Sequence, residues 1–277
     1  MKRALWNFGI PSMVLFLGIG GIGTAQAQDA EHEELAKKLS NPVSDLVSVP
    51  FQFNWDNGVG PNEDLRHILN VQPVVPFSLS EKWNLIGRWI MPFLSQPELS
   101  PGSGTASGLG DIVASGFFSP KTSHGGVTWG LGPVVSLPVT TNPLLGSGKW
   151  SAGPTAVVLK QSGPWTVGGL VNHLWSFADT GKPERADVNQ TFLQPFLAYT
   201  TKNAVTLNIT SETTANWEAA SGEGWTVPIQ LVATKVTRFG PFPFSIGGGV
   251  GWYVETPTGG PEWRLRTQFV LLLPHGK

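Results

Sequence analysis

The sequence has 277 residues, of which 40% are hydrophobic and 13% are charged, and it is rich in glycine (34), proline (23) and tryptophan (12). This hydrophobic content can form a buried core, which excludes a disordered chain. The 18 basic and 19 acidic residues give a formal net charge of -1, so no nucleic-acid partner is expected. The absence of cysteine excludes disulfides, thiolate metal sites and cysteine nucleophiles.

The first 27 residues have the pattern of a cleaved export signal. Lys2 and Arg3 precede an apolar stretch, and residues 25–27 (Ala-Gln-Ala) supply the small residues that a signal peptidase recognises. Pro11 and several glycines shorten the apolar stretch below the roughly 20 residues that a transmembrane helix needs. We therefore predict a signal peptide at residues 1–27.

Residues 28–44 are predicted to form an N-terminal periplasmic helix and a linker. Four acidic residues stand at the start of residues 29–40, and Lys37 and Lys38 stand near the end, which is the charge order that the helix dipole favours. Pro42 ends the helical pattern.

Residues 45–277 alternate apolar side chains with polar or small ones, which is the period of a β-strand. Leu207 and Asn208 illustrate the alternation, in which one face of each strand is oily and the opposite face is polar. Turn residues divide this region into segments at residues 46–56, 66–79, 83–93, 108–119, 126–139, 149–161, 164–176, 188–201, 204–217, 224–237, 243–255 and 262–273.

The segments are 11 to 14 residues long, whereas strands of soluble proteins average about five or six and a strand that crosses a bilayer needs about nine to eleven. Short and longer connections alternate between them, as in outer-membrane barrels. The fold class predicted is all-β: an antiparallel up-and-down transmembrane β-barrel of about 12 strands, preceded by a short helix.

Tryptophans near the ends of the segments are typical of the aromatic girdles at membrane interfaces. They are Trp55, Trp83, Trp129, Trp150, Trp165, Trp175, Trp217, Trp225, Trp252 and Trp263. Prolines inside the segments conflict with this pattern, because each removes a donor from the strand ladder. They are Pro50, Pro73, Pro76, Pro92, Pro133, Pro138, Pro154, Pro195 and Pro228.

Several strings of residues resemble a bacterial outer-membrane β-barrel family labelled as transporters or after the meta-cleavage pathway of phenol degradation, and sometimes mislabelled as a neuropeptide precursor. The strings are residues 41–46 (NPVSDL), 50–54 (PFQFN), 69–77 (LNVQPVVPF), 108–111 (GLGD), 117–121 (FFSPK), 146–150 (GSGKW), 153–160 (GPTAVVLK) and 192–196 (FLQPF). The resemblance implies a bacterial outer-membrane location, contact with outer-membrane lipid and insertion by the barrel-assembly machinery. It also implies that prolines within strands are usual in this family.

No catalytic, cofactor or metal site is predicted. Residues 146–149 (Gly-Ser-Gly-Lys) resemble half a phosphate loop, but Pro143 and Trp150 stand where a glycine and a Ser or Thr are required. The five histidines show no metal-ligand spacing. His173 and Ser176 suggest an acyl-hydrolase dyad on the barrel wall, which we keep as a third and distant alternative.

Strand parity places charges of both signs on the inward face, so we expect a hydrated or ion-paired lumen. The charged candidates for lining the lumen are Arg66, Arg88, Asp111, Glu212, Glu255, Arg264 and Arg266, joined by Asp56. The neutral candidates are Gln52, Asn70, Gln72, Gln194, Thr210 and Gln230. The four arginines fall on neighbouring strands and form a positive stripe, which favours anionic solutes. The alternative is that Asp56 and Glu255 pair with the stripe and neutralise it.

Twelve strands lie between the eight that side chains can fill and the sixteen that leave an open channel. The function predicted is a passive transporter or channel for small solutes, with aromatic and anionic solutes as candidates, and without a cofactor. A closed structural or partner-binding barrel without transport is the alternative.

Overall fold

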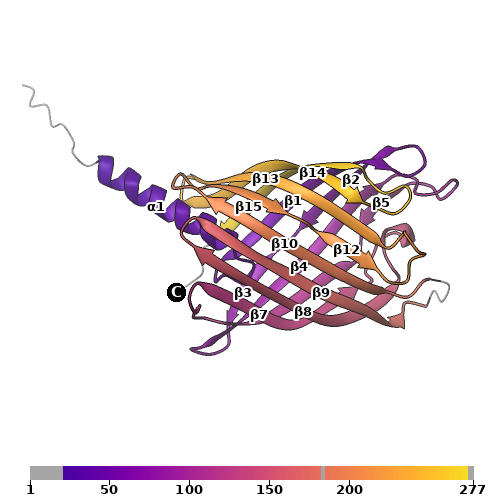
Figure 1. Ribbon diagram of the computed structural model, residues 1–277, viewed down its shortest axis with the longest axis horizontal. Coiled ribbons are helices and arrows are strands. Elements are labelled where there is room, and N and C mark those ends of the chain that lie inside the picture. Colours follow the sequence, from indigo (N-terminus) through magenta and orange to yellow (C-terminus); the bar gives the residue numbers. More distant parts are fainter. Residues whose placement is uncertain (1–20, 182–184, 274–277) are drawn as a thin grey trace, which may run out of the picture.

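The computed structural model describes residues 21–181 and 185–273, with side chains from Asp29 onward. Fifteen β-segments form one antiparallel sheet, which closes into a barrel because β1 pairs with β15 and β9 pairs with β10 (Figure 1). Three barrel strands are each divided into two segments, so the fifteen segments make twelve strands, and the predicted fold class is confirmed.

Nine strands are continuous. They are β1 (Val47–Val59), β4 (Trp83–Gln96), β7 (Val127–Leu137), β8 (Lys149–Ser162), β9 (Trp165–Asp179), β10 (Asn189–Thr200), β13 (Trp225–Phe239), β14 (Phe242–Glu255) and β15 (Trp263–Leu273). The divided strands are β2 (Asp64–Val71) with β3 (Val74–Ser78), β5 (Ala106–Leu109) with β6 (Ile112–Pro120), and β11 (Val205–Thr210) with β12 (Thr213–Asn216). The helices are α1 (Gly21–Leu39) and the short 3-10 helix η1 (Pro143–Leu145).

The two faces of the strands have the predicted polarity in β11. Leu207 and Ile209 are 54% and 43% exposed on the outer wall, whereas Thr206 and Thr210 are buried inside. Exposed tryptophans gather near both ends of the wall. Trp83, Trp129 and Trp165 lie at the end that carries α1, and Trp150, Trp175, Trp217, Trp225, Trp252 and Trp263 lie toward the opposite end. An apolar belt between two bands of tryptophan side chains matches the hydrocarbon core of a bilayer and its two interfaces.

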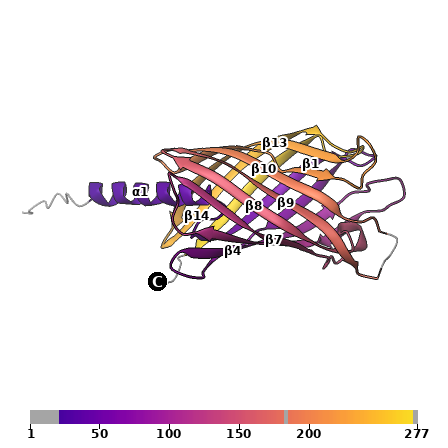
Figure 2. The same cartoon turned by 60° about the horizontal axis from the view of Figure 1, so that its bottom comes forward.

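The connections are short at the end that carries α1 and mostly longer at the other end. The short turns are residues 79–82, 121–126, 163–164, 201–204 and 240–241. Figure 2 shows the tilted strands and α1, which projects from one mouth of the barrel. Within the described ranges, no helix is both long and apolar enough to span a membrane. The helix begins at Gly21, earlier than the predicted start at residue 29, so it overlaps the end of the predicted signal peptide, the first 20 residues of which lie outside the described part of the chain.

Several of the prolines within strands lie next to interruptions of the ladder. Pro73 lies in the gap between β2 and β3. Pro92 faces a register shift between β5 and β6, where its carbonyl accepts the Gly110 N–H at 2.8 Å. Pro133 and Pro154 are directly opposite each other on β7 and β8. Bulges and gaps of this kind absorb the missing N–H donors, so the prolines are compatible with a closed barrel.

The interruption between β11 and β12 has a proline on each side. The register places Pro195 of β10 opposite Ser211 and Pro228 of β13 opposite Glu212. Ser211 N–H donates to the Pro195 carbonyl at 3.2 Å, and Pro228 follows a bulge at Val227. The gap therefore leaves Glu212 on the inner face without a regular ladder on either side.

The interior is divided into an apolar part and a polar part. Along β4, β6, β8 and β9 the inward side chains form an apolar cluster, and Val43 of the linker packs into it from the mouth. The cluster consists of Val43, Ile86, Phe117, Val157, Leu159 and Leu170. The expected polar inner face is therefore only partly present on these strands, because apolar side chains packed against the linker lie beside inward polar residues such as Arg88, Ser151 and Thr155.

The end of α1 closes the same mouth. Ala36 is 2% exposed and packs with Ala204, Val236 and Leu272 at the ends of the strands. The Gln161 side chain donates to the carbonyl of Lys37 at 3.0 Å. Apolar contacts and hydrogen bonds thus fix the end of α1 inside the barrel rim.

Candidate functional site in the barrel lumen

The first and last strands close the barrel through a ladder of inward polar side chains. The β1–β15 register places Asp56 opposite Arg264 and Asn54 opposite Arg266. In the β1–β2 pair, Asp56 is also opposite Arg66. Directly opposite residues of neighbouring strands are close enough for their side chains to interact. The register therefore brings predicted lumen residues from three strands together.

Asp56 is completely buried and accepts hydrogen bonds from three side chains. Arg264 donates to its two oxygens, with Nε 2.6 Å from Oδ1 and Nη2 3.0 Å from Oδ2. Arg66 donates from Nη2 to Oδ2 at 2.8 Å, and the Tyr253 hydroxyl donates to Oδ1 at 3.1 Å. A buried carboxylate needs such partners because desolvation of an unpaired charge is costly.

Glu212 joins the same network from the gap between β11 and β12. Its two carboxylate oxygens accept from Nη1 and Nη2 of Arg266, each at 2.8 Å, and Arg264 Nη1 lies 3.3 Å from Oε2. Arg266 Nε also donates to Asn54 Oδ1 at 2.7 Å. Bidentate pairing of this kind fixes both the position and the orientation of the guanidinium group.

Glycines on β14 make room for this connection. β13 and β14 separate Glu212 from β15. A Cβ on Gly251 would lie 2.9 Å from Gln230 Cγ, and a Cβ on Gly249 would lie 2.1 Å from the Leu231 carbonyl oxygen. Because glycine places no side chain on the inner face of β14 at these positions, the arginines of β15 can extend past this strand to Glu212.

Arg88 of β4 belongs to a separate hydrogen-bonded chain. Its Nη2 donates to Gln72 Oε1 at 3.1 Å, and Gln72 Nε2 donates to Gln52 Oε1 at 2.8 Å. Within residues 21–181 and 185–273, no carboxylate oxygen lies within 4.0 Å of Arg88. Arg88 therefore contributes a positive charge that a glutamine, and not an acid, contacts.

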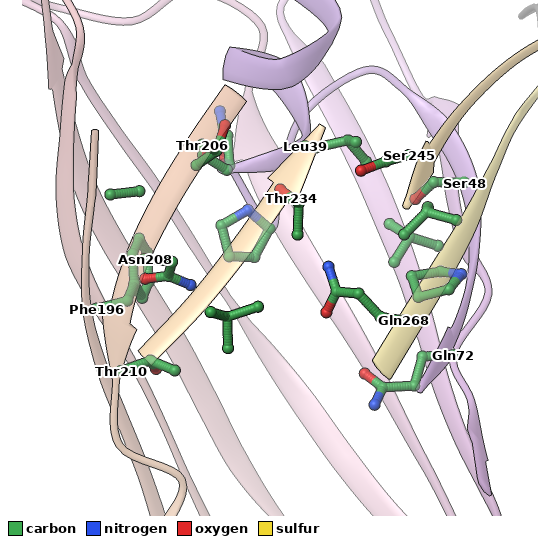
Figure 3. A pocket seen from close by; sticks show the side chains of 18 of the residues that line it. Leu39, Ser48, Gln72, Phe196, Thr206, Asn208, Thr210, Thr234, Ser245 and Gln268 are labelled. Atoms are coloured by element: carbon green, nitrogen blue, oxygen red, sulfur yellow. The ribbon is translucent and has the colours of Figure 1, made fainter. Parts of the chain in front are cut away.

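A cavity of about 220 Å³ lies between the N-terminal segment and these charged groups. Residues 36–44 contribute to one end of it, and Arg88, Glu212 and Arg266 lie toward the other end. Figure 3 shows Asn208, Thr210 and Phe196 on one side and Gln72, Gln268 and Ser48 on the other. The cavity wall is polar in part, and Val74, Phe196, Ala198, Val232 and Val270 add apolar surface.

Two predicted lumen residues lie away from the arginines. Asp111 Oδ2 accepts from the backbone N–H of Ser147 at 2.6 Å and from its hydroxyl at 2.7 Å, so this acid attaches the loop of residues 138–148 to the wall. Glu255 is exposed at the end of β14. Neither side chain belongs to the group formed by Asp56 and Glu212.

The candidate acyl-hydrolase pair does not form. Burial alternates along β9, with Leu170 and Leu174 buried inside and Val171 and Trp175 exposed outside. Residues of the same parity share a face of a strand, so His173 and Ser176 lie on opposite faces. Both ring nitrogens of His173 have other partners, with Nδ1 2.8 Å from Thr191 Oγ1 and Nε2 3.1 Å from Asn189 Oδ1.

Sequence reasoning missed Tyr253, Asn54 and the loop serine Ser147. Tyr253 shares the inward parity of Gly249 and Gly251, and Asn54 shares that of Asp56, so a complete parity analysis of β1 and β14 would have found both. The role of Ser147 depends on how a loop folds back onto the wall, which strand periodicity does not predict.

No protein-family model matches the chain, and no curated protein matches it. An outer membrane channel from Pseudomonas putida F1 is similar in structure, with a TM-score of 0.59 and 17% identity, over 82% of this chain and 94% of the channel. Outer membrane phospholipase A from Escherichia coli gives a TM-score of 0.47 and 12% identity over 87% and 98% of the two chains. A BenF-like porin from Pseudomonas fluorescens Pf-5 gives a TM-score of 0.30 and 7% identity over 82% of this chain and 98% of the porin. The first similarity establishes a common barrel fold, and the other two are too weak to support a comparison.

Proposed function

We propose that this protein is a passive outer-membrane channel with a narrow lumen that admits small solutes and prefers anions. The observation that carries the proposal is the cavity between residues 36–44 and the arginines of the inner wall, enclosed by a barrel with an oily outer belt. A polar lumen inside an apolar wall is the arrangement of transmembrane barrels that conduct solutes. The proposed location is the bacterial outer membrane, reached through cleavage of the signal peptide at residues 1–27.

The charges in the lumen support the preference for anions. In the described part of the chain, the four guanidinium groups of Arg66, Arg88, Arg264 and Arg266 lie near two carboxylates, those of Asp56 and Glu212. The group therefore carries an excess of positive charge. In a narrow low-dielectric passage such an excess raises the local concentration of anions.

The N-terminal segment acts in this proposal as the periplasmic plug. Val43 packs inside the barrel with Ile86 and Phe117, and Ala36 packs at the rim. Both termini of an even-stranded barrel lie on the same side of the membrane, and α1 and the end of β15 lie at one end here (Figure 1). The flux of solute then depends on how far residues 36–44 move out of the barrel mouth.

Conductance of the purified protein in planar bilayers tests the proposal. The expected result is small, discrete conductance steps in the full mature chain and larger steps after deletion of residues 29–44. If neither form conducts ions, the protein is not a channel.

A closed structural barrel is the second candidate, because two observations favour it. The Arg266–Glu212 pair occupies part of the lumen in front of β13 and β14, and Val43 packs into the apolar part of the interior. This candidate predicts no conductance in either form of the chain. We propose no enzymatic role and no cofactor for either candidate.

A further inference from the structure

Arg88 has hydrogen-bonding capacity that the described residues do not use. A guanidinium group carries five N–H donors, and the hydrogen bond of Arg88 to Gln72 occupies one of them. The arginines Arg66, Arg264 and Arg266 each contact a carboxylate, whereas in the described part of the chain Arg88 does not. The unused donors belong to a residue that lines the cavity.

Two glutamines hold Arg88 in place. Gln52 accepts from the Gln72 amide nitrogen at 2.8 Å, and this bond turns the Gln72 oxygen toward Arg88. All three side chains line the cavity. Because the guanidinium is positioned before a ligand arrives, its planar fork is ready for a carboxylate, whose two oxygens match it.

A second polar group lies on the other side of the cavity. The side-chain oxygen of Asn208 is buried and has no hydrogen-bond partner within the described residues. Figure 3 shows Asn208 beside Phe196, with Gln72 on the far side of the cavity. The amide nitrogen of Asn208 lies on the cavity side in Figure 3 and has no hydrogen-bond partner among the described residues, so it can donate to the oxygen of a ligand hydroxyl.

Apolar side chains line the cavity beside both polar groups. Val74 is opposite Arg88 in the β3–β4 register, and Val232 is opposite Asn208 in the β11–β13 register. The cavity volume of about 220 Å³ is smaller than the roughly 300–1,000 Å³ of sites for drug-sized ligands. A ligand that fits has a compact apolar body with a carboxylate at one end and a hydroxyl at the other.

We infer that the lumen cavity is a binding site for a small hydroxylated monocarboxylate, with its carboxylate on Arg88 and its hydroxyl on Asn208. This inference deepens the proposed function, since it names the class of solute that pauses in the channel. It makes Arg88 the residue that determines charge specificity and Asn208 the residue that distinguishes hydroxylated acids from plain ones.

Titration calorimetry on the purified full chain tests the inference with three matched probes. These are 4-hydroxybenzoate, benzoate, which lacks the hydroxyl, and 4-hydroxybenzyl alcohol, which lacks the carboxylate. We expect 4-hydroxybenzoate to bind most tightly and the alcohol to bind at least about tenfold more weakly, because a hydrogen bond to a charged group is lost.

Variants assign the two contacts. Arg88→Gln should lower the affinity for 4-hydroxybenzoate and for benzoate alike by at least about tenfold. Arg88→Lys should retain part of the affinity that Arg88→Gln loses. Asn208→Ala should lower the affinity for 4-hydroxybenzoate to that for benzoate, and the affinity for benzoate should not change. Lys235→Gln is the control, because it removes an exposed positive charge from the outer wall.

Equal affinity for the acid and the alcohol, or full affinity in a folded Arg88→Gln barrel, would overturn the inference. Heat-modifiable gel mobility establishes that each variant is folded. Conductance measured on the same preparations separates the two proposals. If the protein conducts ions but does not bind the acids, the binding-site inference is wrong and the channel proposal stands. If it binds the acids but does not conduct ions, the channel proposal is wrong and the binding-site inference stands.

Discussion

Arg266 and Glu212 are joined inside the lumen by two hydrogen bonds of 2.8 Å, although β13 and β14 separate the strands that carry them. The contact requires the interruption between β11 and β12, which frees Glu212, and the glycines of β14, which leave room for the arginine. It links the polar ladder of β1 and β15 to the gap between β11 and β12, beyond β13 and β14. The pair therefore limits both the width and the charge of the lumen.

Glu212→Gln tests this link. The change leaves Arg266 without its carboxylate, and removal of one partner from a buried pair typically costs about 3–5 kcal/mol. We expect a lower free energy of unfolding in urea-treated vesicles and a stronger preference for anions in the reversal potential. Glu81→Gln, in an exposed turn, is the control. Unchanged stability together with unchanged selectivity would show that the pair has no such role.

Two neighbouring residues of β11 test the assignment of the wall faces. Leu207 is 54% exposed on the outer wall, and Asn208 lines the cavity. Arginine near the bilayer midplane on the lipid face costs about 2–4 kcal/mol, so Leu207→Arg should reduce the yield of folded barrel in lipid vesicles. Asn208→Arg should fold with a higher yield. Equal yields are incompatible with the assigned faces.

Val43→Asp tests the plug. Val43 is 5% exposed within the apolar cluster, and a buried unpaired carboxylate is unfavourable. We expect the linker to leave the interior and the single-channel conductance to rise while the barrel stays folded. Glu34→Gln, which changes a side chain that is 69% exposed on α1, should leave the conductance as it is. A folded Val43→Asp barrel with wild-type conductance would argue against the plug.

Glu223 connects two loops at the end of the barrel opposite α1. The Thr258 backbone N–H, 2.6 Å from one oxygen, and the Thr258 hydroxyl, 2.8 Å from the other, lower the pKa of Glu223 below its usual value of 4.5. A lowered pKa in the folded state means that the contact stabilises the loops above pH 4.5 and is lost as the pH falls through the lowered value. The Thr258 amide resonance should therefore titrate with a midpoint below 4.5, and Glu223→Gln should abolish that titration. A midpoint at or above 4.5 contradicts the contact.

The strand architecture could be predicted because every barrel strand has a lipid face of period two. The alternation of Leu207 and Asn208, the segment lengths and the positions of Trp83 and Trp263 at strand ends are all local properties of the sequence. The strand count followed from them, the N-terminal helix followed from the charge order of residues 29–40, and both are confirmed. The prolines looked contradictory because sequence alone does not show that Pro195 and Pro228 face the same gap.

The interior was less predictable because inward side chains contact residues that are distant in the chain. Strand β4 is apolar on both faces, so its periodicity does not reveal that Ile86 packs against Val43 of the linker. Parity did select the arginines of the lumen. Their pairing depends on strand register, which places Arg264 opposite Asp56 but leaves Arg88 with a glutamine.

The reversal potential in planar bilayers under a salt gradient tests the central claim most directly. We predict that the wild-type protein is anion-selective, because its lumen has more guanidinium groups than carboxylates. Changing both Arg88 and Arg264 to Gln should move the reversal potential toward cation selectivity, since Asp56 and Glu212 remain. A cation-selective wild-type pore, or a double variant with an unaltered reversal potential, would contradict the account.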